Sequence, residues 1–90
     1  MPIPEFTSQL KRDYRLSAKR SLDMPLIDTL ILSLAEGKPL DEWHKDHPLR
    51  GEYAGCRECH IQPDWLLVYR IVEETIVFVR TGTHSDIFSE

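Results

Sequence analysis

Three strand-like segments joined by short turns constrain the fold of this chain more than any other feature. Residues 57–62 alternate between polar and apolar side chains, and residues 65–72 and 75–80 are rich in β-branched and aromatic residues. Pro63-Asp64 and Glu73-Glu74 connect them. Such short connections join antiparallel neighbours, because a parallel pair needs a long crossover. The sequence therefore predicts a three-stranded antiparallel meander.

Helical periodicity replaces this pattern earlier in the chain. Leu10, Tyr14 and Ala18 recur at a spacing of four behind the capping candidates Thr7 and Ser8. This spacing predicts a helix with one apolar stripe.

A second helix is predicted directly after the first. Asp23 is a candidate cap, Pro25 is tolerated in a first helical turn, and Gly37 marks the end. Its apolar residues fall on one side: Leu26, Ile27, Leu30, Ile31 and Leu34. The helix pair is expected to pack on the sheet, and residues 3–6 can add an edge strand, where proline is tolerated. The predicted fold class is α+β: two N-terminal helices packed on a small twisted antiparallel sheet, in the order β-α-α-β-β-β.

Composition limits the functional classes that are open to the chain. Ninety residues, 41% of them hydrophobic, suffice for one domain over residues 1–90 and are too few for two. The formal charge of -4 lacks the basic excess of a general nucleic-acid binder. The apolar stretch 26–35 falls short of the roughly 20 residues that span a bilayer. No basic and apolar leader opens the chain, so a cytoplasmic protein with reduced thiols is expected.

Positive charge is concentrated in residues 11–20. Five Lys or Arg residues stand there against Asp13 alone, which gives the segment a formal charge of +4 and leaves -8 for the rest of the chain. The interpretation stays open between a solvated helix face and a surface for phosphates or an acidic partner.

The histidines all lie in the second half of the chain: His44, His47, His60 and His84. Alternation along residues 57–62 puts His60 on a polar face with Glu58. His84 follows the last strand, and His47 lies in the long loop before the sheet. Both can approach the region of His60.

A cluster of imidazoles with a carboxylate and guanidinium groups suits metal-free cleavage of RNA. A base removes the proton from the 2′-hydroxyl, an acid protonates the departing 5′ oxygen, and cations stabilise charge on the phosphoryl oxygens. Imidazole can serve as acid or base near neutral pH. Asp64 lies in the turn beside His60, and alternation puts Arg80 on the face of Ile76 and Phe78. The alternative is that the histidines are ordinary surface or hydrogen-bonded residues.

Cysteine spacing offers other interpretations of the same region. Residues 56–60 match C-x-x-C-H, the attachment motif of c-type haem. His44 and His47, with Cys56 and Cys59, supply four ligands of the types that zinc accepts. Alternatively no cofactor is needed, because a strand here turns Cys59 into the core.

Three stretches resemble the YafQ-type toxins of the RelE/ParE superfamily: KDHPLRG over 45–51, YAGCRECHIQPDWLLVY over 53–69 and RTGTHSDIF over 80–88. The two predicted helices upstream agree with this family. The resemblance implies a bacterial type II toxin that enters the ribosomal A site and cuts mRNA. It also implies that the protein uses no metal and no cofactor.

The resemblance carries functional residues onto this chain. It implies catalytic roles for His47, His60, Asp64, His84 and Arg80, and substrate-binding roles for Trp65, Phe88, Arg57 and Lys45. Proton transfer is expected of His47 and His60, with His84 and Arg80 at the scissile phosphate. Asp64 either orients a histidine or acts as the base. From its residue type alone, Trp65 is either a core anchor or a stacking platform for a base.

The implied partners are a cognate antitoxin of the DinJ or RelB type, the 70S ribosome and mRNA, with no membrane contact. Relatives of this kind are usually basic, so contacts with rRNA are expected of the basic segment Lys11 to Arg20. The alternative function is a catalytically weak or inactive toxin fold that acts with its antitoxin as a DNA-binding repressor. Gyrase inhibition of the ParE kind does not need this set of histidines.

Overall fold

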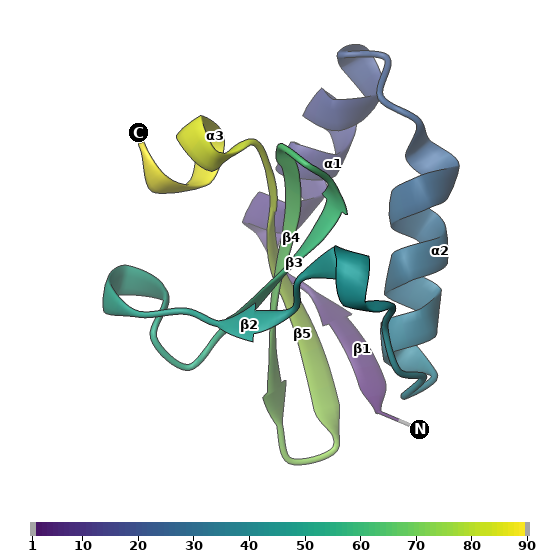
Figure 1. Ribbon diagram of the computed structural model, residues 1–90, viewed down its shortest axis with the longest axis vertical. Helices are drawn as coiled ribbons and strands as arrows, with labels where there is room; N and C mark the ends of the chain where they lie inside the picture. The colour runs from purple at the N-terminus through teal and green to yellow at the C-terminus, as the bar shows by residue number, and fades with distance from the viewer. Residues whose placement is uncertain (1, 90) are drawn as a thin grey trace.

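The computed structural model describes residues 2–89 and shows an α+β fold (Figure 1). Within these residues a five-stranded sheet has the strand order β1-β5-β4-β3-β2. Its strands are β1 (Ile3–Phe6), β2 (His47–Pro48), β3 (Arg57–Gln62), β4 (Trp65–Val72) and β5 (Thr75–Gly82). The helices are α1 (Ser8–Lys19), α2 (Met24–Ala35) and α3 (His84–Phe88), with the short 3-10 turns η1 (Glu42–His44) and η2 (Gly51–Tyr53). The predicted class and element order are confirmed, with β2 and α3 as additions.

The direction of β1 corrects one expectation. β3, β4 and β5 form the predicted antiparallel meander, but β1 runs parallel to β5, with Ile3 opposite Thr75 and Phe6 opposite Phe78. The sheet is therefore mixed and not fully antiparallel. The reason is that two helices and the strands β2 to β4 separate β1 from β5 along the chain, so no tight turn forces the two strands into opposite directions.

Helix α1 begins at the predicted cap. The side-chain oxygen of Thr7 accepts a hydrogen bond from the backbone N–H of Leu10 at 2.9 Å. Leu10 is buried and Tyr14 is half-buried, but Ala18 is exposed and Ser17 is buried instead. A spacing of four drifts around a helix with 3.6 residues per turn, so the third member of the predicted stripe leaves the inner face.

Helix α2 follows the expected boundaries. It starts after Asp23, whose side chain makes no capping hydrogen bond, and the chain turns beyond its end at Gly37, with φ +73°. Ile27 and Leu30 are buried in the core, whereas Leu26 is 38% exposed.

Both faces of the sheet are covered, by different elements (Figure 1). We call the side under α1 and α2 the helix face, and the opposite side, which carries α3 and η2, the site face. The helix face holds the larger apolar cluster: Leu10, Ile27, Leu30, Leu34, Cys59, Ile61, Trp65, Leu67, Tyr69, Ile76 and Phe78. The site face holds a smaller one: Cys56, Leu66, Val68 and Ile87. Alternation along β3 and β4 explains why neighbouring residues join different clusters.

Trp65 is a core residue. Its side chain belongs to the helix-face cluster, it is only 2% exposed, and its Nε1–H donates to Thr81 Oγ1 at 3.1 Å. A ring buried in this way offers no surface on which a base can stack. The expectation that Trp65 binds substrate is therefore corrected to the core-anchor alternative.

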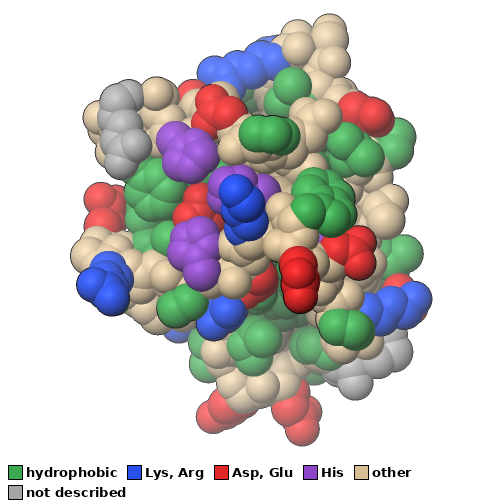
Figure 2. All heavy atoms as spheres, viewed as in Figure 1, with side chains coloured by type: hydrophobic (Ala, Val, Ile, Leu, Met, Phe, Trp, Pro, Cys, Tyr) green, Lys and Arg blue, Asp and Glu red, His purple; other side chains and the backbone are tan. Residues whose placement is uncertain are grey.

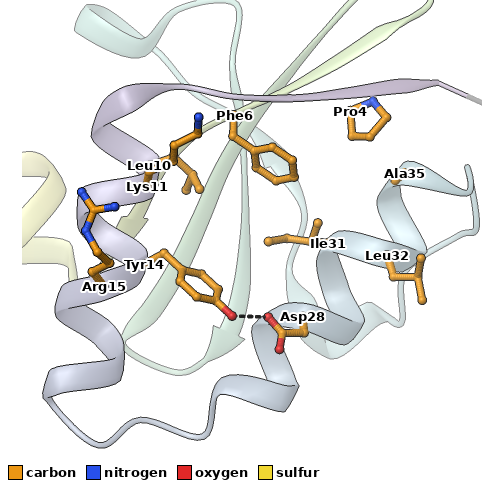
Figure 3. A pocket seen from close by; sticks show the side chains of 10 residues that line it. All are labelled: Pro4, Phe6, Leu10, Lys11, Tyr14, Arg15, Asp28, Ile31, Leu32 and Ala35. Atoms are coloured by element: carbon orange, nitrogen blue, oxygen red, sulfur yellow. Dashed lines mark hydrogen bonds between the residues drawn. The ribbon is translucent and has the colours of Figure 1, made fainter.

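An apolar groove of about 680 Å³ lies between β1, α1 and α2 (Figure 3). Phe6 and Ile31 point into it, and Tyr14 donates a hydrogen bond to Asp28 across it at 2.7 Å. Lys11 lines the groove on the side of α1. No helix in the described part of the chain is long and apolar enough to cross a bilayer.

Candidate active site

Three histidines from different elements meet on the site face. β3 carries His60, the two-residue strand β2 carries His47 opposite Glu58, and His84 opens α3. The ring centre of His60 lies 6.5 Å from that of His47 and 5.8 Å from that of His84. Figure 2 shows histidine side chains gathered on one face of the molecule, with acidic side chains between and beside them. Residues distant in sequence thus form one cluster.

Glu58 lies beneath this cluster and is almost fully buried. Its Oε2 lies 3.0 Å from Nε2 of His47. Its Oε1 lies 4.0 Å from Nε2 of His60 and 3.9 Å from Nε2 of His84. Oε1 has no hydrogen-bond partner among residues 2–89. The sequence analysis placed Glu58 on the face of His60 without giving it a function; its position two residues before His60 was the available signal.

Asp64 fixes the orientation of His84. Its Oδ1 accepts the backbone N–H of His84 at 3.0 Å and lies 2.6 Å from the ring Nδ1. These hydrogen bonds, the backbone one foremost, lower the pKa of Asp64 below its ordinary value. The carboxylate is then ionised at neutral pH and can only accept, so Nδ1 of His84 carries the proton and Nε2 faces Glu58.

The environment of His60 favours the neutral ring. Burial lowers its pKa most, and the charges of His84 and Lys45 act in the same direction, while Glu58 opposes them. Lys45 is exposed and lines a small hollow beside the His60 ring together with Trp43. Lys45 therefore lies next to the cluster.

Two aromatic rings continue the row of histidines. The Phe88 ring centre lies 6.5 Å from that of His84, and Tyr53 packs edge-on against Phe88 at 5.8 Å. From the sequence, Phe88 was expected to bind substrate, whereas Tyr53 was given no role. Tyr53 lies in the long loop before the sheet, and only the tertiary fold brings it to α3.

Arg80 lies at the end of this row, held by α1. Its Nε donates to Asp13 Oδ2 at 2.8 Å, and its Nη1 donates to the Tyr53 hydroxyl at 3.3 Å. The hydrogen bond to Asp13 is the main reason that the pKa of Arg80 is raised. The side chain of Arg80 is 19% exposed. Asp13, the one acid of the basic segment, was not assigned this role from sequence.

A β-bulge corrects the predicted orientation of Arg80. The register between β4 and β5 shifts between Val68 and Tyr69, so Arg80 pairs with Val68 while Tyr69 pairs with Phe78. Val68 belongs to the site-face cluster and Phe78 to the helix-face cluster. Strict alternation put Arg80 with Phe78; the additional residue in the bulge moves it to the register of Val68.

Arg57 lies away from the cluster. It pairs with Tyr69 across β3 and β4, and its Nε lies 2.5 Å from Asp46 Oδ1. The Tyr69 hydroxyl also donates to Asp46. Arg57 thus anchors the segment before β2 and faces away from Glu58, so the structure does not bring it together with the histidines.

The cysteines do not lie together as the zinc and haem alternatives would require. Cys56 is buried on the site face and Cys59 on the helix face, and both are free thiols. Burial raises the pKa of Cys59 strongly. His44 makes a 2.8 Å hydrogen bond to the backbone oxygen of His60. Because Cys56 and Cys59 belong to clusters on opposite faces of the sheet, they do not converge with the histidines on one zinc or haem site.

Another group on the site face does have the donor set of a metal centre. Among residues 2–89, Glu58, His60 and His84 each offer a ligand atom, and these atoms lie within 4.8 Å of one another. The group combines a carboxylate with two imidazoles, which are ligands for zinc and copper.

Fold and site together define a small toxin of the kind found in type II toxin-antitoxin systems. The family described as "Bacterial toxin of type II toxin-antitoxin system, YafQ" matches residues 3–89. The chain belongs to this YafQ toxin family, as the three sequence stretches implied.

Similar proteins cover nearly the whole chain. The mRNA interferase toxin YafQ of Escherichia coli (strain K12) is 39% identical over 85 residues, which are 93% of this chain and 92% of the relative. A chain of the E. coli DinJ-YafQ complex superposes with a TM-score of 0.91 at 36% identity, over 98% of this chain and 99% of that one. A metal-bound toxin from Helicobacter pylori superposes with a TM-score of 0.89 at 39% identity, over 98% of this chain and 100% of that one.

Proposed function

We propose that this chain is a ribosome-dependent endoribonuclease that cleaves mRNA in the A site by metal-free acid/base chemistry. The observation that carries this proposal is the convergence of three imidazoles and the carboxylates of Glu58 and Asp64 on one face. The mRNA interferase name of the E. coli relative supports the same activity.

His60 is the proposed general base. Its lowered pKa keeps the ring neutral at pH 7, and a neutral imidazole can accept the proton of a 2′-hydroxyl. The 2′ oxygen then attacks phosphorus and forms a 2′,3′-cyclic phosphate as the bond to the 5′ oxygen breaks. His47, whose Nε2 lies 3.0 Å from Glu58 Oε2, is the proposed acid that delivers the proton required by the departing 5′ oxygen. One proton is taken and one is returned, so the step is balanced.

His84 and Arg80 are the proposed phosphate ligands. Asp64 fixes the His84 ring with Nε2 toward the cluster, so Asp64 acts as the orienting carboxylate and not as the base. Phe88 and Tyr53 form the aromatic end of the row, where a base can stack. Lys45 supplies a cation at the His60 end. Trp65 and Arg57 have no part in this proposal.

The proposed partners follow from the family and from the charge pattern. A cognate antitoxin of the DinJ or RelB type is proposed because the E. coli relative forms a complex with DinJ. The cations of α1 are exposed on its outer surface, and we assign them to rRNA. A protein that works on translating ribosomes acts in the cytoplasm.

The test is a cleavage assay with purified chain, 70S ribosomes and a defined mRNA, read by primer extension. Cuts are expected with ribosomes and not with mRNA alone. His60→Ala and His84→Ala should each lower the rate by about 10²- to 10⁴-fold. His44→Ala, which removes a histidine outside the cluster, should cleave as the parent does.

Circular dichroism of each variant separates loss of a side chain from loss of the fold. Transcripts that stay intact with folded parent protein contradict the proposal. They favour the repressor alternative, in which the antitoxin complex binds DNA without cleaving RNA.

A further inference from the structure

We propose that Trp43 stacks on a base of the RNA substrate, and that this base belongs to the nucleotide on the 5′ side of the scissile phosphate. The inference rests on the proposed function, because it adds a substrate-binding residue to the same site. It also fixes the direction in which the RNA strand crosses the site face.

Trp43 is a large aromatic residue that the fold leaves in solvent. It lies in η1 and is 56% exposed, whereas the other tryptophan, Trp65, is 2% exposed and serves the core. In the described part of the chain, neither apolar cluster of the sheet includes Trp43. Its indole therefore adds little to the core and offers a flat surface on which any base can stack.

The position of Trp43 connects it to the proposed general base. η1 packs against β3, and a hollow of about 130 Å³ between them is lined by His60, Trp43, Lys45 and Pro63. The backbone of η1 defines this position, because the N–H of Lys45 donates to the carbonyl oxygen of Glu42 at 3.0 Å and closes the turn. A base that stacks on Trp43 therefore lies beside the imidazole that accepts the 2′-hydroxyl proton.

The other side chains of the hollow suit a nucleotide. Lys45 is exposed and supplies a cation for the phosphate strand, and Pro63 adds an exposed apolar ring from the turn between β3 and β4. Figure 2 shows hydrophobic side chains and a Lys or Arg side chain on the same face as the histidines. An aromatic surface next to a cation is the combination that binds single-stranded nucleic acid.

Two aromatic groups at opposite ends of the cluster distinguish the two nucleotides at the cut. Trp43 lies beside His60, whereas the Phe88 ring centre lies 6.5 Å from that of His84. The 2′-hydroxyl that His60 deprotonates belongs to the nucleotide 5′ of the scissile phosphate, so the base of that nucleotide is next to Trp43. The following base then contacts Phe88 and Tyr53, and the RNA runs 5′ to 3′ from η1 to α3.

Contact is tested by photo-crosslinking of the full chain on 70S ribosomes. The mRNA is 2′-O-methylated across the A-site codon, which blocks cleavage, and 4-thiouridine replaces each codon position in turn. Mass spectrometry identifies the crosslinked residue, and primer extension on unmodified mRNA locates the cut. The nucleotide 5′ of the cut should crosslink to Trp43, and the next nucleotide should crosslink to Phe88 or Tyr53.

The contribution of the stack is measured by cleavage kinetics. Trp43→Ala should raise KM for programmed ribosomes by about tenfold or more and change kcat little, because a stacked base is held equally before and during the reaction. Trp43→Phe keeps a ring and should restore KM toward that of the parent. Leu32→Ala removes another exposed apolar side chain, 59% exposed on α2, and should cut as the parent does. Circular dichroism confirms that each variant is folded.

The outcomes separate this inference from the proposed function. Cleavage by the parent without a crosslink to Trp43, or with unchanged KM for folded Trp43→Ala, overturns the inference and leaves the nuclease supported. A raised KM without the crosslink means that Trp43 contacts the ribosome, which also overturns it. A crosslink from the nucleotide 3′ of the cut overturns the strand direction.

A parent that crosslinks through Trp43 but never cuts leaves RNA binding by Trp43 supported, while the proposed function and the strand direction fail. A parent that neither crosslinks nor cuts overturns both proposals.

Discussion

The carboxylate of Glu58 lies at the centre of the candidate site because of two local facts. It alternates with His60 along β3, and β2 pairs His47 directly opposite it. A buried carboxylate with three imidazoles around it is expensive unless its charge is used. This is the reason for including Glu58 in the proposed site.

Asp64 offers a sharp test at this scale. Asp64→Asn keeps the shape of the side chain but no longer requires a proton on Nδ1 of His84, because an amide can also donate. We expect a fall of about 10²-fold in kcat, with little change in KM, since the ring is still present but wrongly oriented. Gln62→Asn, on an exposed neighbour in the same turn region, is the control. A KM effect alone would mean that Asp64 serves binding and not orientation.

Contacts between α1 and β5 hold one end of the site together. Asp13 accepts from Arg80 Nε at 2.8 Å and from the backbone N–H of Thr81 at 3.2 Å. The pairing of β1 with β5 ends at Phe78. Beyond that point α1 packs against β5 instead. The same ion pair orients Arg80 toward Tyr53.

Breaking this connection should destabilise the protein. Asp13→Ala leaves Arg80 without its ion-pair partner, and we expect a loss of about 3 kcal/mol in the free energy of unfolding. Asp28→Ala removes only an exposed hydrogen bond to Tyr14, which should cost about 1 kcal/mol. Urea unfolding followed by circular dichroism measures both. Equal losses would show that the Asp13 ion pair stabilises the fold no more than an exposed hydrogen bond does.

Helix α3, which presents His84, depends on Asp86. Its carboxylate accepts the backbone N–H of Thr83 at 2.9 Å, and the Thr83 side chain accepts from Asp86 in return, which completes a capping box. Arg20 donates to the same carboxylate at 2.6 Å. These contacts, Arg20 foremost, lower the pKa of Asp86 from 3.8 to about 2.

This pKa predicts how stability varies with pH. A depressed pKa means that the carboxylate stabilises the fold above 3.8, and that this stability is lost as the pH falls toward 2. Asp86→Ala should therefore lower the free energy of unfolding by about 1–2 kcal/mol at pH 7. The difference from the parent should shrink below about pH 3.8. Asp41→Ala, at a cap without a side-chain hydrogen bond, is the control. A difference that is constant with pH would contradict the prediction.

On the scale of the whole molecule, one sheet separates two surfaces. The helix face carries the core, the groove of Figure 3 and the basic outer side of α1. The site face carries the histidines. The basic segment of α1 and the histidine cluster thus lie on different sides of a chain whose formal charge is -4.

Neutralising the basic side should affect ribosome binding and leave the chemistry unchanged. We expect the combined change of Lys11, Arg12, Arg15 and Lys19 to Gln to weaken ribosome binding by about tenfold or more and to make it less dependent on salt. Co-sedimentation with 70S ribosomes at several salt concentrations measures this. Lys38→Gln, which removes a cation paired with Glu36, should change neither. Unchanged binding by the quadruple variant would remove α1 from the proposed interface.

The sequence predicted much of the fold and part of the site. The bounds of β3 and β4 and the shared face of Glu58 and His60 follow from local strand patterns, and the Thr7 cap follows from its residue type, whereas β5 runs two residues beyond its predicted end. Their positions in the chain allowed His47 and His84 to approach His60, and the family resemblance implied that the three share a site. The parallel direction of β1 and the bulge beside Arg80 were missed, because both depend on pairing between distant segments.

What the sequence determined by itself is the main helices and strands and, within a regular strand such as β3, the side on which each residue falls, since neighbouring residues fix both through backbone geometry. The tertiary structure alone decided which side chains meet. Asp13 reaches Arg80 and Tyr53 reaches Phe88 across long stretches of chain, and Trp65 became core and not surface. Packing decides these contacts, because burial and partner geometry depend on the whole fold and leave no local pattern to read.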